Sequence, residues 1–334
     1  MSATAFPERA RQHRMNLDVA AVRRLEPDLW RAPSAHNTQP WTLRYGTDAV
    51  TVGWDPDRTL PAGDPTGRDL RLSVGAFVET CLVVCADAGL AVEFVPDPDE
   101  RSHRVGRLVG AARRYATPFD TAAVRARATN RGAHLPGPVP PADLAVAEAM
   151  GAELVTVPGR RLVPLLAAAD RHLFGDARVA AELRSWLRLT PRHPRYHVDG
   201  LTDRALDLSR AQAVGLRVAL RGLPVLRRAG LPRLLAAASG GLLGDDHTVL
   251  VLVGPADAAG QVDAGRALMR VWLALSAAGL ACHPLSQLLD CAGTRARLAA
   301  MIGIAEPERL LHVARVGRAA AAAPCSARRV SADR

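Results

Sequence analysis

Arg31-Ala-Pro-Ser-Ala-His-Asn-Thr-Gln-Pro-Trp41 is the stretch of sequence on which the prediction of the fold depends. Pro33 and Pro40 stiffen it, because a proline fixes its own φ and keeps the residue before it out of the α region. The polar residues between the prolines are Ser34, His36, Asn37, Thr38 and Gln39. A stiff loop dense in donors and acceptors suits the polar edge of a flat heteroaromatic ligand. The alternative is a capped turn in which Ser34 and Asn37 satisfy backbone groups.

The sequence around this loop predicts a mixture of helices and strands. Residues 16–30 have apolar side chains near helical spacing, and residues 41–45 and 49–54 alternate around Gly46-Thr47-Asp48, which predicts a β-hairpin. Further helices are predicted at residues 69–88, 118–126, 143–150, 162–172, 176–187 and 262–278, with an arginine-rich helical region at 201–243. Further strands are predicted at 91–95, 105–109, 153–157, 248–253 and 310–316, and residues 282–290 are expected to form a loop that passes into a helix.

Two of the predicted helices have matching glycines. Gly75 precedes Gly89-Leu-Ala by the same interval by which Gly265 precedes Gly279-Leu-Ala. Such a matched pair is one indication of an internal duplication. A chain of 334 residues is long enough for two modest domains or one duplicated domain.

The composition argues against several classes of protein. All of the positive charge behind the net +10 comes from arginine, the arginines are spread along the chain, and aromatic residues are only 4%, so specific nucleic-acid binding is not expected. No apolar run reaches the roughly 18 residues that span a bilayer. The start of the chain lacks an apolar leader segment. We therefore expect a cytoplasmic protein with no membrane partner. The five cysteines lack paired metal-type spacing, so reduced thiols and no metal site are expected.

A second polar motif, Arg127-Ala-Thr-Asn-Arg131, follows a predicted short helix. Each guanidinium group can bind two phosphate oxygens at once through charge-assisted hydrogen bonds. Two arginines with the Thr129 hydroxyl could therefore cradle a phosphomonoester. The alternative is a solvated basic loop.

Both motifs resemble those of the nitroreductase family. Pro33-Ser-x-x-Asn-x-Gln-Pro-Trp41 looks like the family's flavin-contacting loop, and its His36-Asn-Thr-Gln form resembles the Acg-type actinobacterial branch. Arg127, Thr129 and Arg131 match the family's Arg-x-Ser-x-Arg motif, which grips the FMN phosphate, with threonine in place of serine.

The resemblance implies further flavin contacts. The stretch from His283 to Gln287 would approach the ring near N5, although Ser286 could instead be a helix N-cap. A late arginine would complete the phosphate site, with Arg315 preferred to Arg318 and a surface pair as the alternative. Arg68 would replace the lysine that many relatives place near N1 and O2. The full set of expected FMN-binding residues is Pro33, Ser34, His36, Asn37, Gln39, Arg68, Arg127, Thr129, Asn130, Arg131, Leu285, Ser286, Gln287, Arg315 and Arg318.

The fold that the resemblance implies is an α+β nitroreductase fold duplicated in one chain. Residues 1–117 would be the first half, with the ring-contacting loop. Residues 118–318 would be the second half, with the phosphate loop and a lid-like helical insertion at 190–243, and residues 319–334 would be a disordered tail. Because each half carries only one motif, we expect a single composite FMN site. The chain would be a monomer with an internal pseudo-dimer, or a homodimer.

The activity that the resemblance implies is that of an FMN-binding oxidoreductase. NAD(P)H would deliver hydride to flavin N5, and a small-molecule acceptor such as a nitroaromatic or a quinone would then receive electrons in a ping-pong reaction. No catalytic side chain is expected, because the flavin carries the chemistry. The alternative is a flavin-binding or sequestering protein without turnover, in which the insertion covers the flavin.

Overall fold

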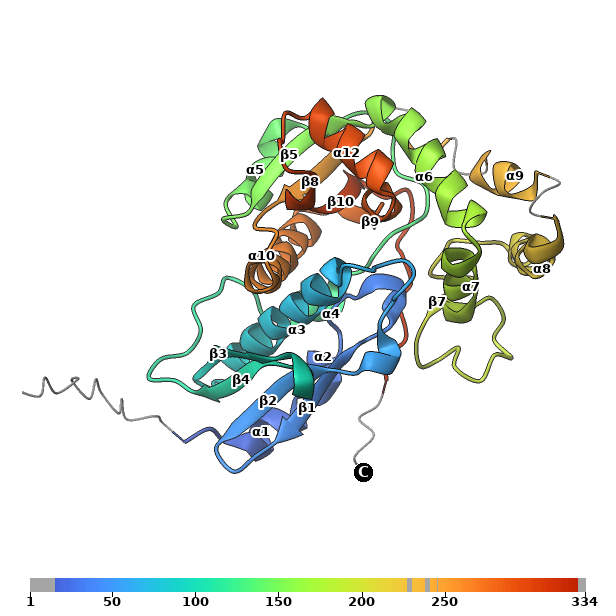
Figure 1. Ribbon diagram of the computed structural model, residues 1–334. Helices are drawn as coiled ribbons and strands as arrows, with labels where there is room; N and C mark the ends of the chain where they lie inside the picture. The colour runs from blue at the N-terminus through green and yellow to red at the C-terminus, as the bar shows by residue number, and fades with distance from the viewer. Residues whose placement is uncertain (1–15, 227–229, 238–240, 245, 330–334) are drawn as a thin grey trace, which may run out of the picture.

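The computed structural model describes residues 16–226, 230–237, 241–244 and 246–329 (Figure 1). The described residues form two four-stranded antiparallel sheets surrounded by helices, so the predicted α+β class is confirmed. The first sheet has the order β1-β2-β4-β3 and consists of β1 (Trp41–Tyr45), β2 (Ala49–Trp54), β3 (Val92–Asp99) and β4 (Arg104–Gly110). Trp41 pairs with Trp54 and Tyr45 with Val50, which confirms the predicted hairpin.

The second sheet has the order β5-β8-β10-β9. Its strands are β5 (Glu153–Pro158), β8 (Thr248–Val253), β9 (Ala281–Pro284) and β10 (Leu310–Gly317). The sequence predicts a loop at the position of β9, and this prediction is wrong. The strand is only four residues long and pairs only with β10. It therefore depends on a partner strand that comes later in the chain, beyond two intervening helices, and not on a local pattern.

Two long helices, α3 (Arg68–Asp87) and α10 (Ala258–Ala277), lie between the sheets (Figure 1). Helix α3 packs on the first sheet and α10 on the second, and Met269 and Leu273 of α10 join the core around α3. Most of α3 is buried, which explains why its sequence is apolar on nearly every side. The order of layers is therefore sheet, helix, helix and sheet. One apolar core lies between the first sheet and α3, and another lies between α10 and the second sheet.

Shorter helices cover the remaining faces. They are α1 (Val19–Arg24), α2 (Glu26–Leu29), α4 (Thr121–Ala126), α5 (Pro141–Glu148), α6 (Val163–Gly175), α11 (Gln287–Asp290) and α12 (Ala292–Met301). The single helix expected over residues 16–30 is divided in two. Pro27 lies in the first turn of α2, where its missing N–H costs nothing, whereas inside one continuous helix it would break the hydrogen-bond ladder.

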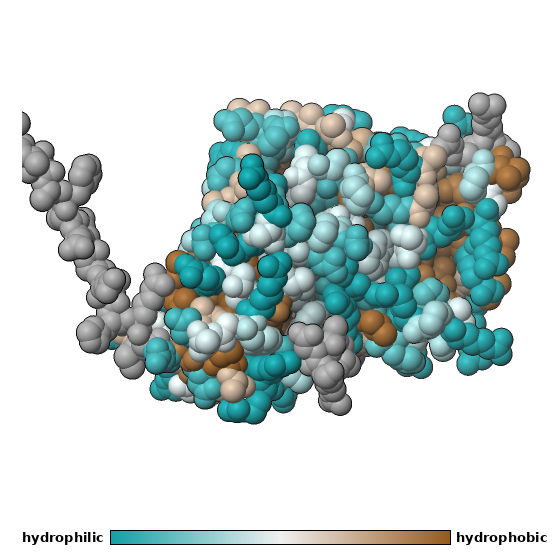
Figure 2. All heavy atoms as spheres, turned by 60° about the horizontal axis from the view of Figure 1, so that its bottom comes forward, coloured by the Kyte–Doolittle hydropathy of each residue, from teal (hydrophilic) through white to brown (hydrophobic). Residues whose placement is uncertain are grey.

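The expected helical insertion projects to one side of the two sheets (Figure 1). Of the expected residues 190–243, it contains the short strand β7 (Leu201–Thr202), α8 (Arg210–Leu226) and α9 (Leu231–Ala237). Two elements that precede residue 190, α7 (Ala177–Trp186) and the short strand β6 (Leu187–Arg188), pack with it. Its apolar side chains form a core of their own. Hydrophobic residues are also exposed on the side of the molecule where α8 and α9 lie (Figure 2). None of the helices in the described part of the chain is long and apolar enough to cross a bilayer.

Residues 319–329, expected to be part of a disordered tail, run back along the molecule. The amide groups of Asn130 and Asn37 donate hydrogen bonds to the carbonyls of Ala321 and Ala327, at 2.8 and 3.1 Å. The backbone N–H of Arg329 donates to Oε1 of Gln39 at 2.8 Å. The alanine-rich composition does not reveal these contacts, because every partner lies far away in the sequence. Residues 330–334 lie outside the described residues.

Candidate functional site

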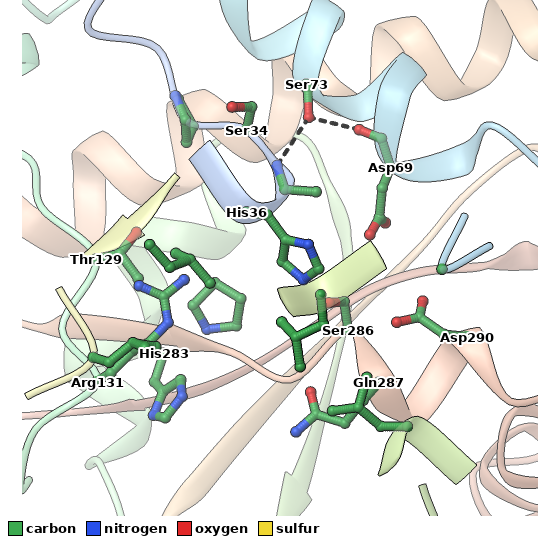
Figure 3. Close-up of a pocket in the computed structure, with 18 of the residues that line it drawn as sticks. Ser34, His36, Asp69, Ser73, Thr129, Arg131, His283, Ser286, Gln287 and Asp290 are labelled. Carbon is green, nitrogen blue, oxygen red and sulfur yellow. Dashed lines mark hydrogen bonds between the residues drawn. The ribbon is translucent and has the colours of Figure 1, made fainter. Parts of the chain in front are cut away.

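A cavity of about 310 Å³ lies where the 33–36 loop, α3, α10, β9 and the insertion meet (Figure 3). This volume is at the lower end of the range typical of small-molecule sites. The polar residues that line it are Ser34, His36, Asp69, Ser73, Thr129, Arg131, His283, Ser286, Gln287, Asp290 and His312. The wall on the insertion side is apolar and consists of Leu173, Phe174, Val179, Leu183, Leu187, Leu201, Leu206, Leu216 and Leu220, with Glu182 among them. Figure 3 shows Thr129 and Arg131 at one end of the cavity and Asp69 and Asp290 at the other.

The loop between the two prolines contributes Pro33, Ser34 and His36 to the cavity wall. The hydroxyl of Ser34 accepts a hydrogen bond from the backbone N–H of Gln39 at 2.9 Å, which closes the turn. His36, Asn37 and Gln39 all have positive φ, at 47°, 53° and 51°. Such backbone conformations are uncommon outside glycine and tend to cluster at functional sites. The sharp turn allows the His36 ring to point into the cavity (Figure 3).

Asn37 and Gln39, both expected to contact a flavin ring, do not line this cavity. Asn37 donates to the carbonyl of Gly200 at 3.3 Å, and Gln39 donates to the carbonyl of Val198 at 2.9 Å. Both residues also bind the 319–329 segment. They therefore attach the insertion and the end of the chain to the loop. Ser34 and His36 are the polar residues of the loop that line the cavity, and Asn37 lines the smaller hollow beside it.

Four arginines gather at the cationic end of the cavity. Arg31, Arg127, Arg131 and Arg328 line a hollow of about 30 Å³ together with Ser34 and Thr129. Within the described residues, none of the four forms a salt bridge, and Nε and Nη1 of the buried Arg127 have no hydrogen-bond partner. Burial lowers the pKa of Arg127 and of Arg131 to about 10. Buried cations without an acidic partner are costly, so this hollow favours an anion.

The sequence prediction missed Arg31 and Arg328 of this cluster, and Arg328 is the one that lies far away in the sequence. Its guanidinium group donates to Oδ1 of Asn37 at 3.1 Å and to the carbonyl of Arg31 at 3.0 Å. Burial lowers its pKa to about 9, and the neighbouring Arg127 and Arg31 contribute to the shift. The sequence signal was an arginine pair in a stretch assigned to disorder, and nothing local indicated that it returns to the loop.

The two arginines expected to complete the phosphate site lie elsewhere. Arg315 is buried on β10, where it donates to the carbonyls of Gly132 and Leu242 at 2.7 and 3.0 Å. It supports the backbone next to Arg131 but lines neither the cavity nor the hollow. Arg318 is 57% exposed and pairs with Asp143 at 3.2 Å. Arg315 lies within β10, whereas Arg318 follows the end of the strand at Gly317, so the two arginines have different surroundings.

Arg68 also differs from its expected role. Its side chain is buried between Asp69 and Asp290, with Nη2 at 2.8 and 2.7 Å from their carboxylate oxygens, and it does not line the cavity. The two carboxylates line the cavity instead. Burial and the nearby Asp69 raise the pKa of Asp64 to about 7 and that of Asp290 well above its usual range. This end of the cavity is therefore acidic, with more carboxyl groups than cations.

Two of the three residues named after β9 line the cavity. Ser286 and Gln287 line the cavity, whereas Leu285 is fully buried in the core. Ser286 occupies the N-cap position of α11 but its side chain makes no capping hydrogen bond, so the hydroxyl group remains available to the cavity. Asn130 accepts from the backbone N–H of Gly132 at 2.9 Å and binds the 319–329 segment, and it lines neither the cavity nor the arginine hollow.

The remaining polar residues of the cavity wall are two histidines and several residues that the sequence prediction did not name. Burial lowers the pKa of His36 and of His312 to about 4, so both rings are neutral at pH 7. Ser73 on α3 donates to the carbonyl of Asp69 at 2.6 Å and accepts from the backbone N–H of Ala35 at 3.4 Å, which links the loop to α3 (Figure 3). The sequence prediction named His36 but not Asp69, Ser73, Asp290 or His312. Within the described residues, no group of three His, Cys, Asp or Glu side chains is placed to hold a metal ion.

No protein-family model matches the chain. A Mycobacterium tuberculosis protein named "Putative NAD(P)H nitroreductase" is 31% identical over 291 residues, which are 83% of this chain and 79% of the relative. Another protein of that organism, named "Putative NAD(P)H nitroreductase acg", is 40% identical over 75 residues, which are 22% of this chain and 23% of the relative. A third, named as an uncharacterized protein, is 30% identical over 77% of this chain and 38% of its own length.

Proposed function

This chain belongs to the nitroreductase family, and we propose that it is an FMN-dependent enzyme that transfers hydride from NAD(P)H to a nitroaromatic or quinone-type acceptor in a ping-pong reaction. The observation that carries the proposal is the hollow formed by Arg31, Arg127, Arg131 and Arg328 at one end of the cavity. A phosphate group there would give the unpartnered N–H groups of Arg127 the anion that they lack. The NAD(P)H donor fits a cytoplasmic location.

The residues of the cavity fit FMN along its length. Arg127, Thr129, Arg131 and Arg328 would hold the phosphate, and Ser34, His36, Ser286 and Gln287 would face the polar edges of the ring. When bound, FMN supplies the hydride chemistry. The protein positions it, and the apolar wall from the insertion excludes water. Asp69 and Asp290 are held by Arg68 at the far end, where a carboxyl group with a raised pKa can hold a proton.

The proposal includes a duplicated fold with one composite site. Each sheet has the strand order first, second, fourth, third along its half of the chain, and in each half a 20-residue helix follows the second strand. Gly75 and Gly265 occupy equivalent places in these helices, at equal intervals before Gly89 and Gly279. The loop residues Ser34 and His36 come from the first half and Arg127 to Arg131 from the start of the second. The two halves would then correspond to the two subunits of a dimer joined in one chain.

An anaerobic titration tests the proposed activity. The protein is loaded with FMN, oxygen is removed, and NADPH or NADH is added while the oxidised-flavin absorbance is followed. The proposal predicts rapid bleaching by at least one nucleotide and recovery when a soluble quinone or a nitroaromatic is added.

The alternative function is flavin binding without turnover, and the insertion is the observation that favours it. Leu201, Leu206, Leu216 and Leu220 of the insertion face the cavity beside five apolar side chains of residues 173–187, so together they could bar nicotinamide. Flavin that both nucleotides leave oxidised for many minutes, but that dithionite bleaches, would support this alternative and contradict the reductase. A colourless protein that does not retain FMN would contradict both.

A further inference from the structure

Exposed apolar side chains are concentrated on one part of the insertion. Of the seven large hydrophobic residues that are exposed in the described part of the chain, five lie on α8 and α9: Val214, Val218, Val225, Leu226 and Leu234. Val225 is 82% exposed and Leu234 is 70% exposed. Figure 2 shows hydrophobic atoms at this edge of the molecule. Single exposed apolar residues are ordinary, but a group on one face indicates an interaction surface.

The same face is basic. Arg210, Arg221 and Arg233 are exposed on α8 and α9, and residues 209–244 contain no acidic or aromatic residue. On α8, Arg210, Val214 and Val218 are four residues apart, as are Arg217, Arg221 and Val225. Residues at this spacing lie on one side of a helix. Arginines and exposed valines therefore form adjacent rows along the outward side of α8.

The opposite side of α8 faces α7 and the cavity. Ala213, Leu220 and Leu223 are buried, and Leu216 and Leu220 reach the cavity. An apolar groove of about 190 Å³ lies between α7 and α8, where Ala180, Leu223 and Pro224 form its walls. The outward side has no such partner among the described residues, and its exposed valines are not needed for the core of the insertion.

The positive charge of this face favours some binding partners over others. A second copy would bring the same arginines together without any acidic residue from 209–244 to neutralise them, and the whole chain carries +10. A nucleic acid would match the charge but not the aliphatic side chains, and no aromatic residue is present for base stacking. Arginine beside aliphatic residues on one helical face is typical of a helix that lies in the interface of an anionic bilayer.

We propose that the outward face of α8 and α9 binds the surface of an anionic lipid bilayer. The valines and leucines enter the interfacial region, and the exposed Arg210, Arg221 and Arg233 contact the headgroup phosphates. This contact lies at a surface and needs no spanning helix. It departs from the expectation of no membrane partner, which rested on the absence of a long apolar run. The proposal does not depend on flavin chemistry.

Co-sedimentation of the full chain with lipid vesicles tests the proposal. The wild-type protein is expected to bind vesicles that contain phosphatidylglycerol and phosphatidylcholine, and to bind pure phosphatidylcholine vesicles at least tenfold more weakly. High salt should weaken the binding to the anionic vesicles. The double variant Val218→Asp/Val225→Asp is expected to bind anionic vesicles at least tenfold more weakly than the wild type.

A matched control separates this face from a general effect of added negative charge. Val146 is an exposed valine on α5, and Val146→Asp is expected to bind like the wild type. Thermal unfolding of each variant establishes that it is folded, and Arg221→Gln provides a second route if the double variant is not. Equal vesicle binding by wild type and a folded double variant would overturn the proposal. So would no binding to anionic vesicles at low salt. A dimer in solution that the double variant abolishes, without vesicle binding, would assign the face to a second copy and overturn it as well.

Discussion

A Cβ atom on Gly75 would lie 2.9 Å from the Cα atom of Gly265, so α3 and α10 cross with their backbones in contact. The relationship is reciprocal, since a Cβ on Gly265 would lie 2.8 Å from the Cα of Leu72 in α3. These are the two glycines that the sequence pairs by their matched distance from Gly89 and Gly279. The crossing joins the helix that packs on the first sheet to the helix that packs on the second, and one end of it borders the cavity through Leu72 and Leu268.

The first prediction concerns this crossing. Gly75→Ala should destabilise the protein by about 1–3 kcal/mol, because the neighbouring atoms are backbone and the helices must separate. Urea unfolding measures the change. Gly215→Ala on α8 is the control: its Cβ meets nothing within 4 Å, so it should stabilise the helix by a few tenths to about 1 kcal/mol. If Gly75→Ala were as stable as Gly215→Ala, the close crossing would be wrong.

Arg131→Ala is predicted to weaken FMN binding, because it removes a charge-assisted contact to the phosphate. The loss should be on the order of 1.5–3 kcal/mol. Fluorescence titration with FMN and with riboflavin checks the assignment, since riboflavin lacks the phosphate and its affinity should hardly change. The exposed Arg318, paired with Asp143, offers the control Arg318→Ala, which should bind FMN like the wild type. An equal loss for both ligands would place Arg131 away from the phosphate.

Arg328→Ala tests which late arginine serves the site. It should weaken FMN binding in the same phosphate-dependent way as Arg131→Ala, because Arg328 lines the same hollow. The variant also removes the hydrogen bond to Asn37, so the end of the chain should become more sensitive to protease. Normal FMN affinity in this variant would contradict the placement of Arg328 at the phosphate.

A third contact, at Asp199, attaches the insertion to the rest of the protein. Asp199 is fully buried and binds Arg58 at 2.7 Å, Arg188 at 3.0 Å and also Arg195, while Arg58 donates to the carbonyl of Thr38 at 2.8 Å. Asp199→Asn would leave Arg58 and Arg188 without a charge partner, which typically costs about 3–5 kcal/mol. We expect trypsin to cut residues 177–226 much faster in this variant.

The exposed Asp143 provides the comparison for Asp199. Asp143→Asn breaks a surface pair with Arg318, and such pairs contribute about 0–1 kcal/mol. Its cleavage pattern should match that of the wild type. Slow, wild-type-like cleavage of Asp199→Asn would show that the buried ion pairs do not hold the insertion.

Asp64 makes the stability depend on pH. Burial and Asp69 raise its folded-state pKa to about 7, from an ordinary value near 3.8. The folded state therefore binds this proton more tightly than the unfolded state, and stability falls as the pH rises from about 4 to about 7. Asp64→Asn should remove the penalty and raise stability at pH 8 by on the order of 1–3 kcal/mol, with little effect near pH 4.

Thermal unfolding of the wild type and Asp64→Asn across this pH range is the measurement. The buried histidines have the opposite effect, because the lowered pKa values of His36 and His312 make stability fall as the pH drops below about 6.5. Both proteins retain them, so their contribution cancels in the difference. If the difference in stability between Asp64→Asn and the wild type were the same at every pH, the raised pKa of Asp64 would be contradicted.

The sequence by itself determined the elements whose pattern is local. Neighbouring residues are enough to predict the period-two alternation of β1 and β2, the apolar run at residues 249–253 of β8, and the long helices α3 and α10 that are each followed by a glycine. The two polar motifs were also recognisable, and Ser34, His36, Thr129 and Arg131 do meet at one cavity. Only the tertiary structure decided the edge strand β9, the return of Arg328 to the loop, the acidic pair Asp69 and Asp290, and the use of Asn37 and Gln39 as anchors. In each of these the partner lies far along the chain, so side-chain direction and burial are set by packing that no local pattern records.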